Sequence, residues 1–499
     1  MKPQVGLTLR LGVSLLGVRS ATAAVGLAVS AVLLGGVGPV NAVALPENER
    51  SSALWYADGL RFDELQAQGA TGEGVKIAVI DAALNPDVAE LAGANITVKG
   101  SYCAFPDTGT PVPAVSDDVA RAGHGTSVVA MLVGNGTSAD GGPGTRGIVP
   151  DAEVWFYSTG LPNESAGDDG GVKCENYDGA RGEFYDTDLP SDSPDYFLGR
   201  ADSYAAWNAV RDGADIVVYS RVDGDSIGWT SALQTALRAG VPIVAGTPNP
   251  DGDITAQTRL NYPYKLNGVV AVSGLDNEGN ILSGGGDRLD PMFGEAQGSS
   301  NLGFLSAGSE LLVPSSAEAW GPSLGYGTSL ATPLVAGVIA LGLEEFPEAT
   351  ANQVLQAMMR TTGPNGLHEP EWVDRKKGYG LANPMSLLNV DPATYPDENP
   401  LFVESADDPR CIQAEEPAPT SMDLCRWSIG PTFEEVWPSG TSEEIGPKEP
   451  SPEATAEWPA WATVAIVLLV VGVAGTAIIV PIAVSRSRRG KTQQAQQRV

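Results

Sequence analysis

Three glycine-rich segments contain an aspartate, a histidine and a serine that could act together. Asp81 follows the apolar run KIAVI, His124 lies in GHGTSVVA, and Ser329 lies in GYGTSLATP. A serine hydroxyl is a weak nucleophile at neutral pH, so it needs a base to take its proton and a carboxylate to orient that base. The chain has only two histidines, so one of them would rarely fall in a GHGT segment by chance. We therefore predict acyl transfer through Ser329, with His124 as the base and Asp81 as its orienting carboxylate.

Asn249 is a candidate for a fourth role, the stabilisation of the oxyanion that forms during acyl transfer. It follows the apolar run VPIV in the segment AGTPNP, and its amide could donate a hydrogen bond to the tetrahedral intermediate. Each of the four residues also has a structural alternative. Asn249 could be a turn residue between two prolines, and Ser329 or Asp81 could cap a helix. His124 could be a buried structural histidine; His368 lies in a polar loop and is interpreted as an exposed residue.

Alternating apolar runs and helical patterns indicate the elements that position these residues. Five runs resemble strands buried on both faces of a parallel sheet, and they cover 76–80, 152–157, 215–220, 241–246 and 268–274. Helical patterns cover 203–213 and 229–240, and each ends at a glycine. We also expect His124 and Ser329 each to open a helix, with Pro333 in the first turn of the second. These patterns predict an α/β fold, a doubly wound parallel sheet flanked by helices.

Both ends of the chain carry apolar segments typical of export and membrane anchoring. Residues 1–42 combine basic residues, an Ala- and Gly-rich run and the small residues of VNAVA, as signal peptides do; a retained membrane helix is the alternative. Residues 461–484 contain no charge and could cross a hydrocarbon core about 30 Å thick. Basic residues follow in 485–499, which predicts a cytoplasmic tail and an extracellular catalytic domain.

The predicted organisation therefore has six parts. They are a signal peptide (1–42), a short N-terminal extension (43–70), a peptidase domain (71–390), a Pro- and Glu-rich extracellular stalk (391–457), a single transmembrane helix (461–484) and the tail (485–499). The stalk is assigned because its composition cannot bury enough apolar area to offset its ordering entropy. Residues 378–388, GYGLANPMSLL, are expected to form the last helix of the domain.

Charge and cysteine content restrict the partners and the compartment. The net charge of -31 excludes a nucleic-acid partner, which would require a basic face. In an oxidising compartment the four cysteines favour disulfides. Cys411 and Cys425 are close in sequence, so we pair them and pair Cys103 with Cys174. No metal or cofactor is expected, although calcium binding by the acidic insert 158–200 is an alternative to a plain surface loop.

Together, the three segments resemble those of the subtilases, the subtilisin-like serine peptidases. The resemblance covers about 70–390 and includes the order Asp, His, Ser along the chain. It implies that Asp81 orients, His124 is the general base and acid, Ser329 is the nucleophile and Asn249 is the oxyanion donor. The short extension, the stalk and the terminal helix resemble the mycosins, which are membrane-anchored subtilases associated with type VII secretion. Protein or peptide substrates and secretion-system components are the implied partners.

Three segments depart from the family pattern. Asp81 is followed by Ala82 and Ala83, where the family normally has a hydroxyl residue and a glycine. The substrate-binding strand reads Ser220, Arg221, Val222 instead of Ser-Leu-Gly, and Pro248 precedes Asn249 in place of a glycine. These changes predict narrow specificity, slow turnover or loss of activity. A catalytically impaired subtilase that serves as a structural component of a secretion complex is therefore the alternative to an active enzyme.

Overall fold

The computed structural model describes most of the predicted peptidase domain and parts of its flanks. The described residues are 45–105, 108–160, 200–221, 226–249, 262–282, 302–374, 376–405, 408, 410 and 430–437, together with the backbone of 177–178 and 183–184. The predicted signal peptide, the transmembrane helix, the cytoplasmic tail and most of the acidic insert lie outside these residues.

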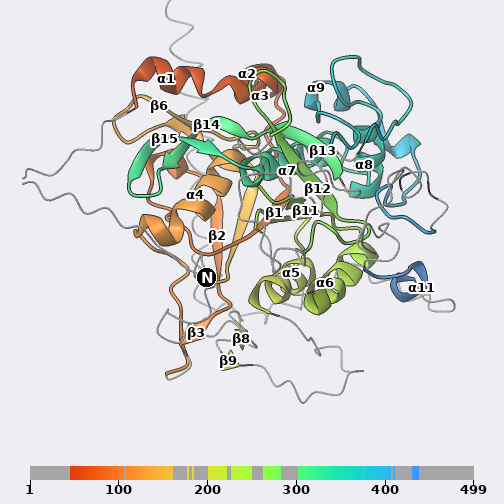
Figure 1. Ribbon diagram of the computed structural model, residues 1–499, viewed down its shortest axis with the longest axis horizontal. Helices are drawn as coiled ribbons and strands as arrows, with labels where there is room; N and C mark the ends of the chain where they lie inside the picture. The colour runs from red at the N-terminus through yellow and green to blue at the C-terminus, as the bar shows by residue number, and fades with distance from the viewer. Residues whose placement is uncertain are drawn as a thin grey trace, which may run out of the picture.

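A seven-stranded parallel sheet forms the centre of the domain (Figure 1). Its order is β13 (Leu302–Ala307), β12 (Val270–Leu275), β11 (Ile243–Gly246), β10 (Ile216–Tyr219), β1 (Lys76–Asp81), β7 (Glu153–Ser158) and β2 (Ile96–Ser101). The five predicted strands are confirmed, whereas β2 and β13 were not predicted. The sheet brings the carboxyl ends of β1, β10 and β11, which are neighbours in this order, to one edge.

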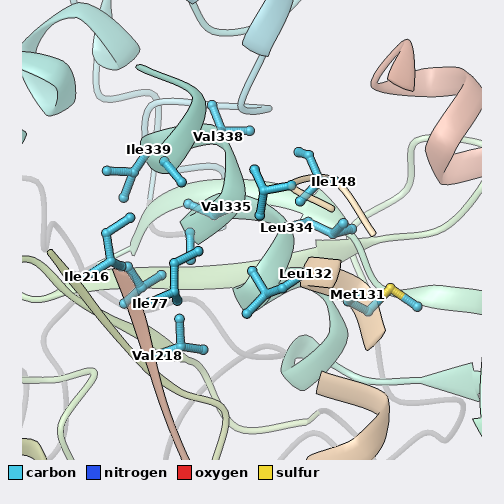
Figure 2. Packing of buried hydrophobic residues seen from close by; sticks show 14 of the residues in the cluster. Ile77, Met131, Leu132, Ile148, Ile216, Val218, Leu334, Val335, Val338 and Ile339 are labelled. Atoms are coloured by element: carbon cyan, nitrogen blue, oxygen red, sulfur yellow. The ribbon is translucent and has the colours of Figure 1, made fainter. Parts of the chain in front are cut away.

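Helices cover both faces of the sheet, as the doubly wound prediction requires. Ile77 and Val79 of β1 pack in one apolar cluster with α4 (Val119–Val133) and α7 (Thr328–Glu345), as Figure 2 shows for part of it. The alternate residues Ala78 and Ile80 pack in a second cluster with α5 (Ala201–Arg211) and α6 (Ser226–Ala239). Side chains alternate between the two faces of a strand, so β1 contributes to both cores.

Shorter elements complete the domain. The helix α8 (Ala351–Met359) packs on α7. Two antiparallel pairs are the hairpin of β14 (Ser309–Ser315) and β15 (Trp320–Tyr326) and the pair of β5 (Asn135–Thr137) and β6 (Pro143–Arg146). The remaining short elements are β3 (Ala104–Phe105), β4 (Thr110–Pro111), β8 (Tyr177–Asp178), β9 (Glu183–Phe184) and the 3-10 turn η1 (Ala89–Leu91). The hairpin of β14 and β15 leads directly into α7.

Three helix boundaries differ from the prediction. α4 begins at Val119 because Asp118 caps it by accepting a hydrogen bond from Ala120 N at 3.0 Å, so His124 lies inside the helix and does not open it. Pro333 is in the second turn of α7, not the first, and therefore leaves the carbonyl of Ser329 without its i+4 donor. The last predicted helix, 378–388, shortens to α9 (Pro384–Leu387), since Gly378 and Gly380 adopt φ values of 55° and 110°.

The N-terminal extension forms three short helices that pack on the catalytic domain. They are α1 (Glu47–Ser52), α2 (Trp55–Gly59) and α3 (Phe62–Ala67). Tyr56 and Phe62 are fully or almost fully buried in the same cluster as α4 and α7. Arg50 forms a bidentate ion pair with Asp140, with N···O distances of 2.8 and 2.7 Å. The extension is therefore part of the folded unit.

The folded domain also reaches further than the predicted end at residue 390. After η3 (Pro392–Thr394), Leu401 and Val403 are almost completely buried, and Asn267 exchanges two hydrogen bonds with the backbone of Val403. The helix α11 (Phe433–Val436) packs on α6. Two parts of the predicted stalk thus belong to the packed domain.

Candidate active site

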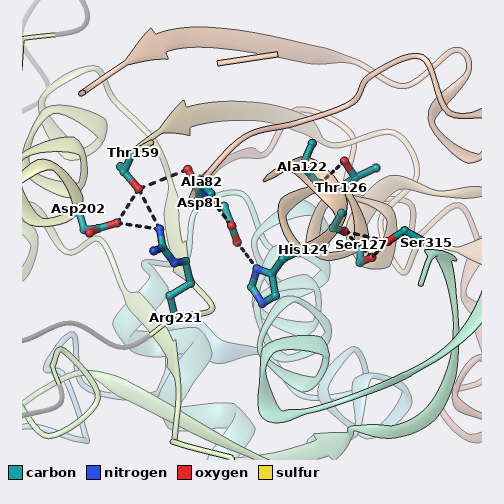
Figure 3. Close-up of polar contacts among 11 residues, drawn as sticks. Asp81, Ala82, Ala122, His124, Thr126, Ser127, Thr159, Asp202, Arg221 and Ser315 are labelled. Carbon is teal, nitrogen blue, oxygen red and sulfur yellow. Dashed lines mark hydrogen bonds and ion pairs between the residues drawn. The ribbon is translucent and has the colours of Figure 1, made fainter. Parts of the chain in front are cut away.

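Asp81 and His124 meet at the carboxyl edge of the sheet (Figure 3). Asp81 is the last residue of β1, and its Oδ2 lies 2.7 Å from His124 Nδ1. The other carboxylate oxygen, Oδ1, accepts a hydrogen bond of 2.7 Å from Ala82 N. The Asp81 side chain is 1% exposed, whereas that of His124 is 38% exposed. A buried carboxylate therefore orients an imidazole that substrate can reach.

The surroundings of Asp81 favour its ionised form. Burial alone raises the pKa of a carboxyl group, because desolvation penalises the charge. The charge and hydrogen bond of His124, the positive charge of Arg221 and the Ala82 N–H outweigh burial and lower the pKa of Asp81 below its usual value. Asp81 is thus an anion that can hold the Nδ1–H tautomer of His124.

The helix α4 lies unusually close to the end of β1, and a glycine permits that approach. A Cβ atom added to Gly125 would lie 2.4 Å from the carbonyl oxygen of Ala83 and 3.2 Å from Asp81 Cβ. On the other side of α4, Ser127 and Ser315 hydroxyls both donate to the Gly123 carbonyl, at 2.8 and 3.2 Å. These contacts fix the segment of α4 that carries His124.

Ser329 and Asn249 lie together at the start of α7. Ser329 is the second residue of that helix and is almost buried. A Cβ atom added to Gly327 would lie 3.1 Å from both Ser329 Oγ and Asn249 Nδ2. Asn249 Oδ1 accepts a hydrogen bond of 2.9 Å from Thr328 N. This contact leaves Nδ2 as the end of the amide that can donate to a ligand.

The hydroxyl of Ser329 makes no hydrogen bond with His124 or any other of the residues that the structure describes. Catalytic hydrogen bonds are often long or poorly aligned in unliganded enzymes. The four sequence-predicted residues thus form two units at one edge of the sheet. One unit is Asp81 with His124, and the other is Ser329 with Asn249.

The predicted substrate-binding strand is only partly described, since Val222 lies outside the described residues. Ser220 follows β10, and its buried hydroxyl has no hydrogen-bond partner in the described structure. Thr247 follows the adjacent strand β11, and its buried hydroxyl also has no hydrogen-bond partner in the described structure. Arg221 instead directs its guanidinium to Thr159, with Nη1 3.2 Å from Oγ1, and to Asp202, 3.5 Å away.

The sequence prediction missed Thr159, Asp202 and Thr247. Thr159 and Thr247 each follow a predicted strand of the sheet, so their position at the carboxyl edge was a usable signal. Asp202 is in the first turn of α5, where an acidic residue is usually explained by the helix dipole. Nothing in the sequence indicated that it would face Arg221.

Two further predictions concern metal binding and disulfide bonds. Within the described ranges, no cluster of His, Cys, Asp or Glu has a metal-binding arrangement, and the acidic insert proposed for calcium lies almost wholly outside them. Cys103 is disulfide-bonded. Because Cys174, Cys411 and Cys425 lie outside the described residues, the pairing stays a prediction.

One described helix is long and apolar enough to cross a membrane, and it is α7. Most of this helix is buried against the sheet and α4, so its apolar composition reflects the core of the domain. The predicted span 461–484 lies outside the described residues.

Comparison with known proteins gives a consistent result. A model of the Subtilase family (Peptidase_S8) matches residues 72–380. Subtilisin DY of Bacillus licheniformis is 26% identical over 315 residues, covering 60% of this chain and 88% of that protein. Mycosin-1 of Mycolicibacterium smegmatis is 24% identical over 398 residues, covering 73% and 79%.

A crystal structure of MycP1 from the ESX-1 type VII secretion system aligns with a TM-score of 0.44 at 21% identity, covering 70% of this chain and 88% of that one. The match of the family model spans the sheet, both helical layers and all four candidate residues. The chain therefore belongs to the Subtilase family of serine peptidases.

Proposed function

We propose that the protein is a serine endopeptidase that cleaves exported proteins through an acyl-enzyme on Ser329. In this mechanism His124 takes the Ser329 proton through Nε2 and later delivers it to the leaving amine. Asp81 holds the imidazole in the required orientation and stabilises its positive charge. The observation that carries the proposal is the 2.7 Å contact between buried Asp81 and His124 at the edge where Ser329 is placed.

Stabilisation of the tetrahedral intermediate is assigned to Asn249 and to the start of α7. The N–H groups of the first turn of a helix have no intrahelical partners and carry partial positive charge. Asn249 Nδ2 lies next to the same glycine as Ser329 Oγ. An oxyanion formed on the carbonyl attacked by Ser329 would therefore have a side-chain donor and backbone donors beside it.

A fluorophosphonate probe tests the proposed nucleophile directly, because it labels only a serine activated by its base. We expect labelling of the wild-type chain and none of Ser329→Ala. Ser231→Ala is the matched control, since the hydroxyl of this half-buried serine on α6 donates to the Ile227 carbonyl of its own helix. Retention of label by a folded Ser329→Ala variant would refute the assignment.

A structural component of a secretion complex is the second candidate function. It is favoured by Ala82, Arg221 and Pro248 at positions that depart from the family pattern, and by the absence of a Ser329–His124 hydrogen bond between these described residues. Absence of labelling in a wild-type chain that melts cooperatively would support this candidate over the enzyme.

The cellular setting is proposed from the sequence. The uncharged segment 461–484 followed by basic residues supports a C-terminal anchor with the catalytic domain outside the cell. The similarity to mycosin-1 supports a role beside a type VII secretion system. A chain truncated before Trp461 should appear in the medium, whereas the full chain should sediment with membranes; membrane retention of the truncated chain would contradict the anchor.

A further inference from the structure

A buried polar cluster lies beside Asp81 on the side opposite His124 (Figure 3). Thr159 Oγ1 donates a hydrogen bond of 2.6 Å to Asp202 Oδ1. Arg221 Nη1 donates to Thr159 Oγ1 at 3.2 Å and lies 3.5 Å from Asp202 Oδ1. The side chains of Arg221 and Asp202 are 14% and 3% exposed. The guanidinium thus lies in the protein interior, paired with a buried carboxylate.

The cluster is attached to the end of β1. Thr159 N donates to the Asp81 carbonyl at 2.8 Å, and Ser158 Oγ donates to the Ala82 carbonyl at 2.5 Å. The Thr159 hydroxyl that binds Arg221 and Asp202 is also 3.4 Å from the Asp81 carbonyl. A shift of Arg221 would therefore be transmitted through Thr159 to the Asp81 carbonyl, which lies directly after the Asp81 side chain in the backbone.

The ionised form of Asp81 depends on nearby positive charge in this chain. Its carboxylate is buried and accepts hydrogen bonds only from Ala82 N and His124 among the described residues. The next residue, Ala82, has no hydroxyl to contribute. A buried charge is costly unless it is paired. Arg221 supplies a fixed positive charge, and its presence helps to keep the pKa of Asp81 below the usual value.

We propose that Arg221 is a positioning residue for Asp81, an inference that rests on the proposed function. It holds Thr159 and Asp202 against the end of β1 and compensates the buried carboxylate, so that Asp81 keeps His124 in its working orientation. The alternative is that Arg221 contacts substrate, as its place on the predicted substrate-binding strand would suggest. The two roles differ in what they do to a ligand too small to fill the substrate subsites.

The experiment measures the rate at which a small alkyl fluorophosphonate labels the full-length chain in detergent. Arg221→Met should lower this rate about tenfold or more, because the charge and both contacts are lost while most of the side-chain volume is kept. Arg221→Lys keeps the charge and should recover most of that loss. Arg211→Met is the matched control, because Arg211 lies on the exposed face of α5 and stacks on Trp207. A wild-type labelling rate in folded Arg221→Met would overturn the proposal and leave the subsite role.

A second measurement does not depend on Ser329 chemistry. The proton that His124 Nδ1 donates to Asp81 should give a far-downfield NMR signal, which Asp81→Asn identifies by its loss. In Arg221→Met we expect this signal to disappear or move upfield, with Arg221→Lys restoring it. If the folded wild-type chain is not labelled, the proposed function fails, and the NMR signal alone decides this inference: an unchanged signal in Arg221→Met contradicts it.

Discussion

The two ends of the Asn249 amide have separate tasks in the proposed mechanism. Oδ1 accepts from Thr328 N at the start of α7, and Nδ2 is left to donate to the oxyanion. Loss of one such donor in subtilisin lowers kcat by about 10²–10³-fold, and we expect Asn249→Ala to lower kcat by a similar factor with little change in KM. Steady-state kinetics on a peptide substrate would measure both.

Asn249→Asp is the matched control for this prediction. It keeps an oxygen that can accept from Thr328 N, but it has no N–H group to donate. A large loss of kcat in both variants shows that an acceptor for Thr328 N is not sufficient, as expected when the donor is lost and a carboxylate that repels the oxyanion takes its place. Wild-type kcat in Asn249→Asp would instead show that Asn249 acts only as a structural residue at the start of α7.

The depressed pKa of Asp81 makes a prediction about stability in acid. Because the pKa is lower in the folded than in the unfolded chain, ionised Asp81 stabilises the folded state above the unfolded pKa of about 3.9. That contribution is lost as the pH falls through the folded pKa. The difference in free energy of unfolding between wild type and Asp81→Asn should therefore shrink below about pH 4. Urea unfolding of both proteins between about pH 3 and pH 7, a range that includes the usual pKa of aspartate, measures this difference in free energy. A constant difference across that range would contradict the prediction.

At the scale of elements, the approach of α4 to β1 depends on Gly125. A methyl group there would meet the Ala83 carbonyl oxygen at 2.4 Å, and a backbone atom cannot rotate away as a flexible side chain can. We expect Gly125→Ala to cost about 1–3 kcal/mol in free energy of unfolding, the usual range for overpacking. Displacement of His124 from Asp81 should lower kcat as well.

Gly59→Ala is the matched control, because Gly59 is in α2 and a Cβ atom there would have no heavy atom within 4 Å. It should be neutral or slightly stabilising, since alanine favours helix more than glycine does. Thermal and urea unfolding of the two variants provide the comparison. Equal stability of Gly125→Ala and wild type would show that α4 and β1 can separate without cost.

The sequence predicted the five innermost strands because each contains a continuous apolar run of β-branched, aromatic or small residues that is buried on both faces. It missed β2, whose residues Ile96–Ser101 are mostly half-buried at the edge of the sheet, and β13, which includes a glycine and two other small residues. The start of α4 was also missed, because Val119–Arg121 are not buried and the continuous buried part of the helix comes later. β2 is only half-buried, whereas β13 is fully buried and its small residues interrupt the apolar run.

The residues of the candidate site also divide into those that the sequence could predict and those that it could not. Asp81, His124 and Ser329 were predictable because each lies in a short segment whose neighbours are constrained by the same chemistry. The Arg221 cluster was not, since Thr159, Asp202 and Arg221 come from three separate segments that only the folded sheet brings together. Contacts between distant segments leave no local periodicity in a sequence.

At the scale of the whole molecule, the N-terminal extension and the catalytic domain share one core. Tyr56 illustrates this, because it is fully buried and its hydroxyl is matched with two groups of Arg146. It donates to the Arg146 carbonyl at 2.9 Å and accepts from Arg146 N at 3.0 Å. The same cluster of buried residues includes Ile77 of β1 and Leu334 of α7. Loss of the extension should therefore weaken the sheet and both helices that carry the candidate site.

Two substitutions of Tyr56 separate its packing from its hydrogen bonds. Tyr56→Phe keeps the ring and should cost about 1–3 kcal/mol, because two part-buried hydrogen bonds to the backbone of Arg146 are lost. Tyr56→Ala also removes the ring and should cost about 3–5 kcal/mol, as truncation of a buried aromatic usually does. If extension and domain form one cooperative unit, tryptophan fluorescence and loss of fluorophosphonate labelling will report the same urea midpoint in each variant. Midpoints that separate, with labelling surviving after the fluorescence change, would show instead that the extension unfolds independently of the catalytic domain.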